Sequence, residues 1–488
     1  HPVAHSFPTR RSSDLDQGIV KKDETGKSNW MYGGDSGEKI HSGNFCMNGI
    51  MSADQTPQPA AWEVKKVYQP FTARPFQPEN KSYIIGNRHH FLNLNEFEVR
   101  WSLTEEGKEI QSGSLSEIAL PAGESIKVNI PYEKIDFKRG YHYYLTLSPH
   151  LIKDTKWESA GYEVAFEQFE IPNPVVVPET IELSAFDPVK MENDDERITI
   201  VANGRQYDID RQTGWLKSII FDGSEYLQSE LMPNFWRALT DNDERGHRIQ
   251  ERYAPWSNAA GGFTLQKITS SQLSDEAVLV SASWKNGEID TKLNIVYLVY
   301  ANGEIKLTYE LFPAETLPEM PRIGMQVKLD NQYDALQWFG KGPHENYADR
   351  QKGAQYGNYK AAVKEDFFHY AMPQESNNRV GVQWFALTNS QGNGLLVRGD
   401  QPLSMSAWPY TMDQLNKAKH INELSFDDGI TLNIDYRQMG VGGDDSWSLQ
   451  ARPHDEYRLP SEIYRYSFSM LPVENWSSDF KRYALPKY

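Results

Sequence analysis

The spacing of apolar and polar residues changes along the chain. Residues 16–70 contain one helical pattern, in which Ala61, Val64 and Tyr68 fall on one face. Residues 71–172 instead contain short runs that alternate or are wholly apolar, as strands do. These runs are Phe91–Leu94, Phe97–Leu103, Ile126–Ile130, His142–Leu147 and Phe166–Ile171. A series of about seven short strands in about 100 residues indicates an immunoglobulin-like β-sandwich.

Residues 181–488 show almost no helical periodicity. Asn286-Gly287 and Asn302-Gly303 are hairpin-type turns within this span. Clear strand patterns occur at Ile198–Val201, Leu293–Tyr300, Ile305–Tyr309 and Leu432–Asp435. Since no linker rich in Pro, Gly or Ser divides the span, we expect one large antiparallel sandwich rather than two small ones.

The remaining segments do not form domains by themselves. With one helix, residues 16–70 cannot bury a core, and we interpret them as the closing strand, loop and helix of a larger α/β unit. Residues 173–180 have the composition of a linker. Residues 1–15 have no periodicity and resemble a translated sequencing adapter, so we expect a non-native scar and a natural protein that begins upstream of Asp16.

Composition narrows the possible partners. The 50 Lys and Arg residues against 67 Asp and Glu residues give a net charge of −17, which argues against nucleic acids and anionic membranes. Cys46 is the one cysteine, which excludes an internal disulfide framework and a cysteine-based zinc site. No apolar run approaches the roughly 18 residues of a membrane helix. The compartment stays open between cytoplasm and periplasm.

The segment Gly440–Ser448 is the most unusual stretch. Its three glycines favour positive φ and sharp turns, and Asp444, Asp445 and Ser446 are suited to bonding the local backbone. Trp447 follows on this polar loop, where a large indole is not expected. Two interpretations remain open: a tryptophan folded back onto the sandwich, or a flat platform on which a sugar ring stacks.

The segment Asp241–Gly246 resembles a calcium loop but fails as one. Arg245 stands where an oxygen ligand is needed, and Arg252 where the closing Glu should be. A polar mobile loop is the better interpretation. The adjacent His89 and His90 lack a third ligand and do not indicate a metal site.

Two other groups of residues allow both a functional and a structural interpretation. The segment Gly342–Arg350, with His344 and Glu345, is either an acid/base cluster or an Arg–carboxylate network that fixes a loop. Asn48 and the carbonyl of Phe45 are possible oxygen ligands for a hard cation, whereas an amide that caps backbone groups is the structural alternative. Glycoside hydrolysis needs two carboxyl groups, but no sequence context singles out such a pair.

Six motifs taken together resemble the C-terminal half of the large β-galactosidases of glycoside hydrolase family two. They are Tyr32–Asp35, Phe45–Gly49, Asp54–Pro59, Arg237–Asp243, Gly342–Arg350 and Gly440–Trp447. The resemblance implies the tail of a (β/α)8 barrel at residues 16–70, an immunoglobulin-like domain at 71–172 and a mutarotase-like super-sandwich at 181–488.

The same resemblance implies roles for individual residues. Phe45, through its carbonyl, and Asn48 match ligands of an active-site sodium ion, and Trp447 matches a tryptophan that stacks on the sugar. The mobile loop beside the active site is matched by Asp241, Asn242, Asp243 and Gly246. The catalytic glutamates are expected in barrel segments before Asp16, so no catalytic residue is assigned here.

The intact protein is therefore expected to be a retaining glycosidase acting on β-galactosides such as lactose, a homo-oligomer, and a binder of magnesium as well as sodium. Two alternatives remain: a non-catalytic carbohydrate-binding module, or a mutarotase-like isomerase that uses His344 or His420 with Glu345.

Overall fold

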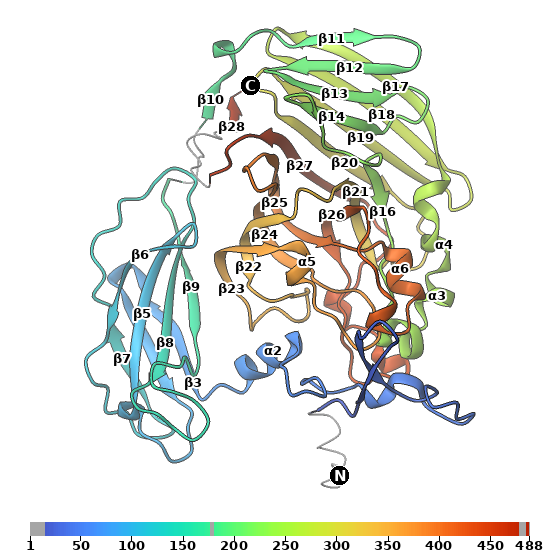
Figure 1. Cartoon of the computed structure of the whole chain (residues 1–488). Helices are drawn as coiled ribbons and strands as arrows, with labels where there is room; N and C mark the ends of the chain where they lie inside the picture. Colours follow the sequence, from blue (N-terminus) through green and yellow to red (C-terminus); the bar gives the residue numbers. More distant parts are fainter. Residues whose placement is uncertain (1–14, 176–179, 478–484, 488) are drawn as a thin grey trace. The chain divides into compact units, whose positions relative to one another are not determined.

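A computed structural model describes residues 15–175, 180–477 and 485–487 (Figure 1). The expected scar, except Leu15, and part of the expected linker lie outside these residues. The described chain forms two compact units. One, the immunoglobulin-like unit, comprises Ala60–Thr180 and Lys352–Tyr359, and the remainder forms the sandwich unit. Among the described residues, no helix combines the length and apolar composition needed to cross a membrane.

The immunoglobulin-like unit has the seven strands that the sequence predicts, in two antiparallel sheets. One sheet has the order β3 (Phe71–Gln77), β4 (Ser82–Asn87), β7 (Ser125–Asn129). The other has the order β6 (Lys108–Ser114), β5 (Phe97–Glu105), β8 (Tyr143–Leu151), β9 (Glu167–Ile171). Alternate residues of β5 enter the core, because successive side chains of a strand point to opposite faces.

Two expectations for this unit are wrong in detail. Phe91–Leu94 is not a strand: Phe91 is exposed, and the Asn93 side chain accepts a hydrogen bond from Asn95 N (3.1 Å), capping a short 3-10 helix. The predicted helix forms as α2 (Pro59–Val67), but Tyr68 lies beyond its end and is exposed.

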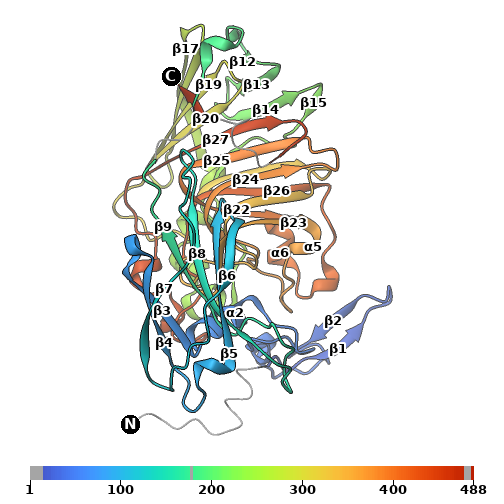
Figure 2. The same cartoon turned by 90° about the vertical axis from the view of Figure 1, so that its left-hand side faces the viewer.

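The sandwich unit contains one five-stranded and one twelve-stranded sheet, which confirms a large antiparallel sandwich (Figure 2). The five-stranded sheet is β11 (Lys190–Asn193), β12 (Arg197–Ala202), β13 (Arg205–Asp210), β14 (Leu216–Phe221) and β15 (Ser224–Glu225). The larger sheet runs β16 (Met232–Asn234), β21 (Arg322–Asp330), β26 (Gly429–Gln438), β25 (Gly394–Trp408), β27 (Tyr464–Val473), β20 (Ile305–Phe312), β19 (Thr291–Tyr300), β18 (Ala277–Asn286), β17 (Phe263–Ser274). Off this path are β22 (Ala335–Gly342), β23 (Gln355–Ala362) and β24 (Arg379–Thr388).

All four predicted strands of this span lie within β12, β19, β20 and β26, and both predicted turns connect neighbouring strands. Short helices and two small strands occupy the connections. They are α3 (Ile249–Arg252), α4 (Ala254–Ser257), α5 (Val363–Asp366), α6 (Met412–Lys417), β10 (Thr180–Glu182) and β28 (Leu485–Lys487).

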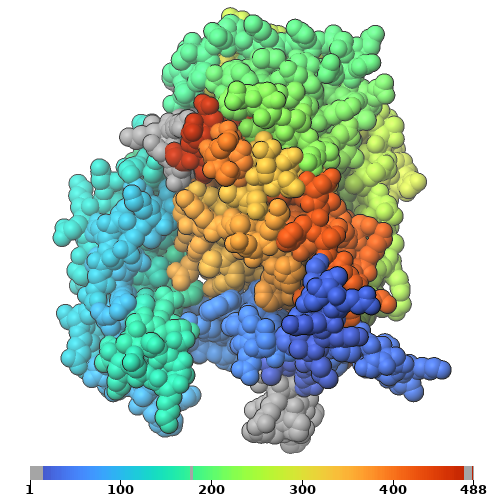
Figure 3. All heavy atoms as spheres, in the orientation of Figure 1, coloured from blue at the N-terminus to red at the C-terminus, as the bar shows by residue number. Residues whose placement is uncertain are grey.

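The N-terminal segment, residues 15–59, lies on the sandwich surface, in dark blue in Figure 3. It contains the hairpin β1 (Ile19–Lys22) and β2 (Ser28–Met31) and the 3-10 helix η1 (Gly43–Cys46). Polar contacts hold it there: His420 Nε2 lies 2.9 Å from Asp35 Oδ1, and Asn422 Nδ2 donates to Asp23 Oδ2 (3.0 Å).

Candidate functional site

The N-terminal segment and the sandwich enclose a cavity of ≈ 210 Å³, which we call the front cavity. Its lining comes from five parts of the sequence far apart along the chain. The lining residues used below are Asp16, Asn44, Phe45, Asn48, Gln58, Asp241, Asn242, Arg245, Glu345, Tyr347, Arg350, Tyr370, Glu375 and Ser446. The cavity therefore joins five of the six motifs that the sequence singles out, all but Tyr32–Asp35.

Phe45 and Asn48, the expected sodium ligands, both line the front cavity. Among the described residues, no hydrogen-bond donor reaches the Phe45 carbonyl, and the Asn48 amide has no partner. The carboxyl groups of Asp16 and Asp241 line the same space. An all-oxygen set with carboxylates suits a hard cation, so the residues present fit sodium.

Asp16 is a cavity residue that sequence reasoning missed. Its side chain is buried; Oδ1 accepts from Gly49 N (2.7 Å) and Oδ2 from Gln58 Nε2 (2.6 Å). Burial raises the pKa of Asp16 to about 6, and the nearby Asp241 carboxyl adds to the effect. A lone aspartate before a short hairpin gives no local signal that could have marked it.

We expected a loop at Asp241–Gly246. The segment instead forms most of a π-helical turn, η5 (Asn242–His247). Asp241 and Asn242 face the cavity, where Asp241 Oδ1 accepts from Asn44 Nδ2 (2.6 Å). Burial raises the pKa of Asp241. The mobility of the segment stays a prediction.

Asp243 is not a cavity-lining residue, and its role is to stabilise the turn through a buried ion pair. Its carboxyl group forms a bidentate pair with the fully buried Arg237: Nε–Oδ2 and Nη2–Oδ1 are both 2.8 Å. Gly246 is required by packing, because a Cβ there would lie 2.2 Å from Ala451 Cβ and 2.7 Å from Ser448 O. The turn is thus tied to the segment that follows Trp447.

In the glycine-rich loop, an aspartate binds the local backbone as predicted, but the glycines do not adopt the predicted backbone conformation. Asp445 Oδ1 accepts from Trp447 N (3.2 Å) and Ser448 N (3.0 Å). None of the three loop glycines has φ in the left-handed region, so the positive-φ expectation is wrong. Close approach explains Gly443 instead, since a Cβ there would lie 2.4 Å from Ala451 C.

Trp447 stands out of the core. Its side chain is 68% exposed, and its ring meets the half-exposed Phe45 edge-on, with centroids 6.0 Å apart and planes at 65°. The neighbouring Ser446 lines the front cavity. The geometry is therefore that of a flat indole presented beside the cavity, not of a tryptophan folded into the sandwich.

Glu345 belongs to a structural network. Its carboxyl group accepts from Asn377 N (2.5 Å) and Ser376 Oγ (3.1 Å), and it also pairs with Arg350 and the Tyr370 hydroxyl. A carboxylate with four partners is poorly placed as a general base. Neither His344 nor His420 is among the cavity-lining residues. The arrangement thus favours the loop-fixing interpretation over the isomerase.

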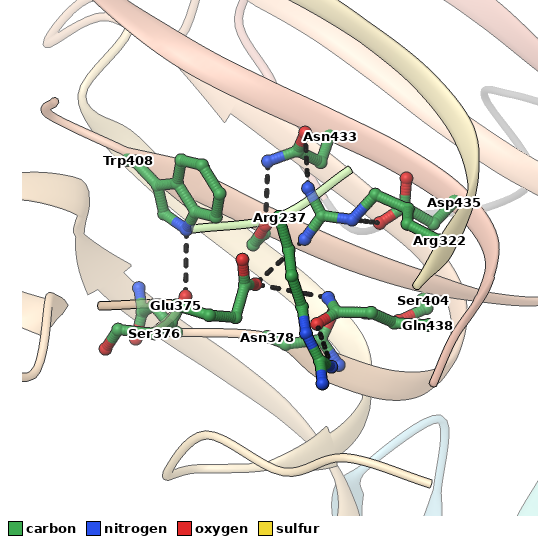
Figure 4. Close-up of polar contacts among 12 residues, drawn as sticks. Arg237, Arg322, Glu375, Ser376, Asn378, Ser404, Trp408, Asn433, Asp435 and Gln438 are labelled. Atoms are coloured by element: carbon green, nitrogen blue, oxygen red, sulfur yellow. Dashed lines mark hydrogen bonds and ion pairs between the residues drawn. The ribbon is translucent and has the colours of Figure 1, made fainter. Parts of the chain in front are cut away.

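A second buried network adjoins the cavity through Glu375, and Figure 4 shows its side chains converging. Glu375 Oε1 accepts from Arg322 Nη2 (2.8 Å) and Gln438 Nε2 (3.1 Å), and Arg322 Nε lies 3.2 Å from Asp435 Oδ2. Burial raises the pKa of Asp435 to about 7, opposed by Arg322. Sequence patterns did not reveal this network, because Arg322 lies on β21, Asp435 and Gln438 on β26, and Glu375 in the segment before β24.

Comparison with protein families assigns the three parts of the chain. Residues 14–73 match the TIM barrel domain of glycosyl hydrolases family 2, and residues 83–172 match domain 4 of β-galactosidase. Residues 202–470, more than half of the chain, match the β-galactosidase small chain. The fold and the matches define a multidomain glycosyl hydrolase architecture. The chain belongs to the β-galactosidases of glycosyl hydrolase family 2.

Individual relatives agree. A β-galactosidase of Priestia megaterium is 35% identical over 94% of this chain and 44% of its own length. Those of Photobacterium profundum and Vibrio cholerae are each 32% identical, over 94% and 93% of this chain and 45% and 44% of their own lengths. The chain thus spans less than half of the length of the curated relatives that it matches.

Solved structures give weaker likenesses. A galactose 1-epimerase of Lactobacillus acidophilus has a TM-score of 0.32 at 10% identity, over 59% of this chain and 100% of its own. An aldose epimerase homologue of C. elegans has a TM-score of 0.33 at 8% identity, over 59% of this chain and 99% of its own. Likeness at this level does not indicate a shared activity.

Proposed function

We propose that this chain is part of a retaining β-galactosidase, which removes terminal β-D-galactosyl residues from substrates such as lactose. Family membership supports the proposal. The single observation that carries it is the front cavity, because it collects Phe45, Asn48 and Asp241 beside the exposed Trp447. The sugar would stack on Trp447 while polar groups of the cavity orient its hydroxyl groups.

Cation binding is part of the proposal. The Phe45 carbonyl and the Asn48 amide oxygen would hold a sodium ion, with the acidic residues Asp16 and Asp241 lining the same cavity. When bound, sodium would supply a fixed positive charge that orients oxygen atoms of the substrate. We keep magnesium, a homo-oligomeric assembly and a cytoplasmic or periplasmic location as proposals for the intact protein.

Catalysis requires two carboxyl groups on opposite sides of the glycosidic bond. We assign these to barrel segments upstream of Asp16, so this chain alone should be inactive. The test is hydrolysis of an aryl β-galactoside by the chain alone and by the chain joined to the upstream part of its reading frame.

We expect turnover from the joined protein and none from the chain alone. A joined protein that is folded but inactive would disprove the β-galactosidase assignment. Turnover by the repurified chain alone, unaffected by removal of trace contaminants, would show that the catalytic carboxylates lie within this chain.

A further inference from the structure

A second hollow on the sandwich unit shares no lining residue with the front cavity. This groove measures ≈ 790 Å³, within the roughly 300–1,000 Å³ typical of small-molecule sites. It is formed by the residues before and within β22, the end of β23 and the turn between β24 and β25. Trp476, which follows β27, completes it, and we call it the Trp476 groove.

Trp476 is held in one orientation by three contacts. Its backbone N donates to Gly392 O (2.8 Å), and its indole Nε1 donates to Gln337 Oε1 (2.9 Å). Its ring meets the buried Trp384 at 61°, with centroids 5.6 Å apart. A ring fixed in this way loses little conformational entropy when a ligand stacks on it.

Beside its apolar residues, the lining of the groove has polar side chains without hydrogen-bond partners among the described residues. Gln332, Ser390 and Gln391 are exposed, and their side chains have no hydrogen-bond partner among the described residues. Carboxamides and hydroxyls both donate and accept, as sugar hydroxyls do. The charged lining residues are Asp334 and Lys360, one of each sign. The groove therefore suits a neutral polar ligand rather than an ion.

We propose that the Trp476 groove is a secondary carbohydrate-binding site. One ring of a neutral oligosaccharide stacks its C–H face on Trp476, while Gln332, Ser390 and Gln391 bind the hydroxyls of that ring and its neighbour. The site goes beyond the proposed hydrolysis, because it uses no residue of the front cavity. It would hold an extended substrate or product on the outside of the sandwich.

The test is isothermal titration of the whole chain with lactose and with β-1,4-galactotetraose. A Trp447→Ala background removes the exposed indole beside the front cavity, so that binding there does not obscure binding at the groove. Adding Trp476→Ala should weaken binding about tenfold, the loss of one stacked aromatic contact. Adding Gln391→Ala should weaken it about threefold, the loss of one hydrogen bond.

Trp157→Ala is the control, because Trp157 is also a tryptophan, is 60% exposed and lies on the immunoglobulin-like unit rather than in the groove, where Trp476 is partly buried. It should leave the affinity unchanged. The proposal is overturned if the Trp447→Ala chain binds neither sugar or if Trp476→Ala binds normally. Should Trp476→Ala fail to fold, Gln391→Ala decides, because its side chain supports no other residue, and unchanged affinity there overturns the proposal.

Discussion

An indole that is 68% exposed, as that of Trp447 is, adds little to the stability of the fold, so its role has to be sought in binding. Asp445 fixes the backbone beneath it, and Phe45 fixes one edge of the ring. The residue is thus oriented before any ligand arrives.

In the protein joined to its upstream part, Trp447→Ala should raise KM for lactose and leave the melting temperature within the change expected of a surface substitution. Loss of a stacking contact corresponds to about 1–3 kcal/mol of binding. Trp447→Leu should also lose affinity, because it keeps apolar bulk without a flat face. A large fall in melting temperature with a normal KM would contradict the platform role.

Asn48 makes a separate prediction about sodium. Asn48→Ala in the joined protein should raise the sodium concentration needed for half-maximal activity, since one oxygen ligand is lost. It should not alter stability, since the amide has no partner in the part of the chain that the structure describes. Asn331→Ala, at an exposed position outside the cavity lining, is the control. Identical sodium curves for the wild type and Asn48→Ala would return Asn48 to a structural role.

Asp16 predicts a pH dependence of stability. Burial raises its pKa from the ordinary 3.8 to about 6, so the folded state holds the proton more tightly than the unfolded state. Its favourable contribution is therefore complete below pH 3.8 and is lost as the pH rises to about 6. Asp16→Asn, which is always neutral, should be more stable than the wild type above pH 6 and should lose that advantage toward pH 3.8.

Urea unfolding across this pH window measures the difference. Asp413→Asn provides an exposed control on α6 (69% exposed). A constant difference between Asp16→Asn and the wild type at every pH would show that the Asp16 carboxyl titrates normally.

At the scale of elements, the π-helical turn η5 and the glycine-rich loop form one packed pair. Asn242 of the turn and Asp241 just before it line the cavity, as does Ser446 of the loop, while Trp447 is exposed beside it. Their contact depends on the missing Cβ of Gly246. Gly246 thus determines how closely the turn and the loop approach, and with them the cavity residues that they carry.

Gly246→Ala should cost about 1–3 kcal/mol of unfolding free energy, because the new methyl group overlaps Ala451 and must displace it. Gly287→Ala, where a Cβ meets open space, should stay within about 0.5 kcal/mol of the wild type. Chemical denaturation measures both, and Ala451→Gly should partly rescue Gly246→Ala. Equal effects at the two glycines would rule out the packing explanation.

At the scale of the whole molecule, the strands of the twelve-stranded sheet are much better buried than those of the N-terminal segment. Strands β19 and β20 bury every second side chain within the sheet. In contrast, Ile19 and Val20 of the β1–β2 hairpin are 73% and 53% exposed. A two-stranded hairpin is marginally stable by itself.

Hydrogen exchange should therefore be fast at residues 19–31 and slow at residues 293–311, since the hairpin opens locally without unfolding the sheet. Mass spectrometry of exchange in the chain measures both segments at once. Equal protection of the two segments in a monomer would mean that the hairpin unfolds only with the sandwich.

Much of the fold was predictable because it depends on local patterns. Alternation along Phe97–Leu103 places every second residue in a core, and Asn302-Gly303 closes a hairpin wherever it stands. The wrong strand prediction also had a local cause: Phe91–Leu94 is largely apolar, but Asn93 caps a 3-10 helix that begins at Leu94.

The candidate site was predictable only through its motifs. The sequence by itself determined that Phe45, Asn48, Asp241 and Trp447 belong to segments with unusual turn chemistry, and the order of those segments determined the family. It could not show that the segments meet, because they lie about 200 residues apart and only the packing of the N-terminal segment on the sandwich joins them.

The tertiary structure alone decided three further properties. Asp16 acquires a raised pKa from burial that distant residues supply, and Trp447 remains 68% exposed, with Phe45 at one edge of its ring. The Trp476 groove exists because β22, β23 and the turn after β24 are brought together by sheet pairing. Sequence patterns record which face of each element is apolar; which elements then share a surface is settled by long-range packing.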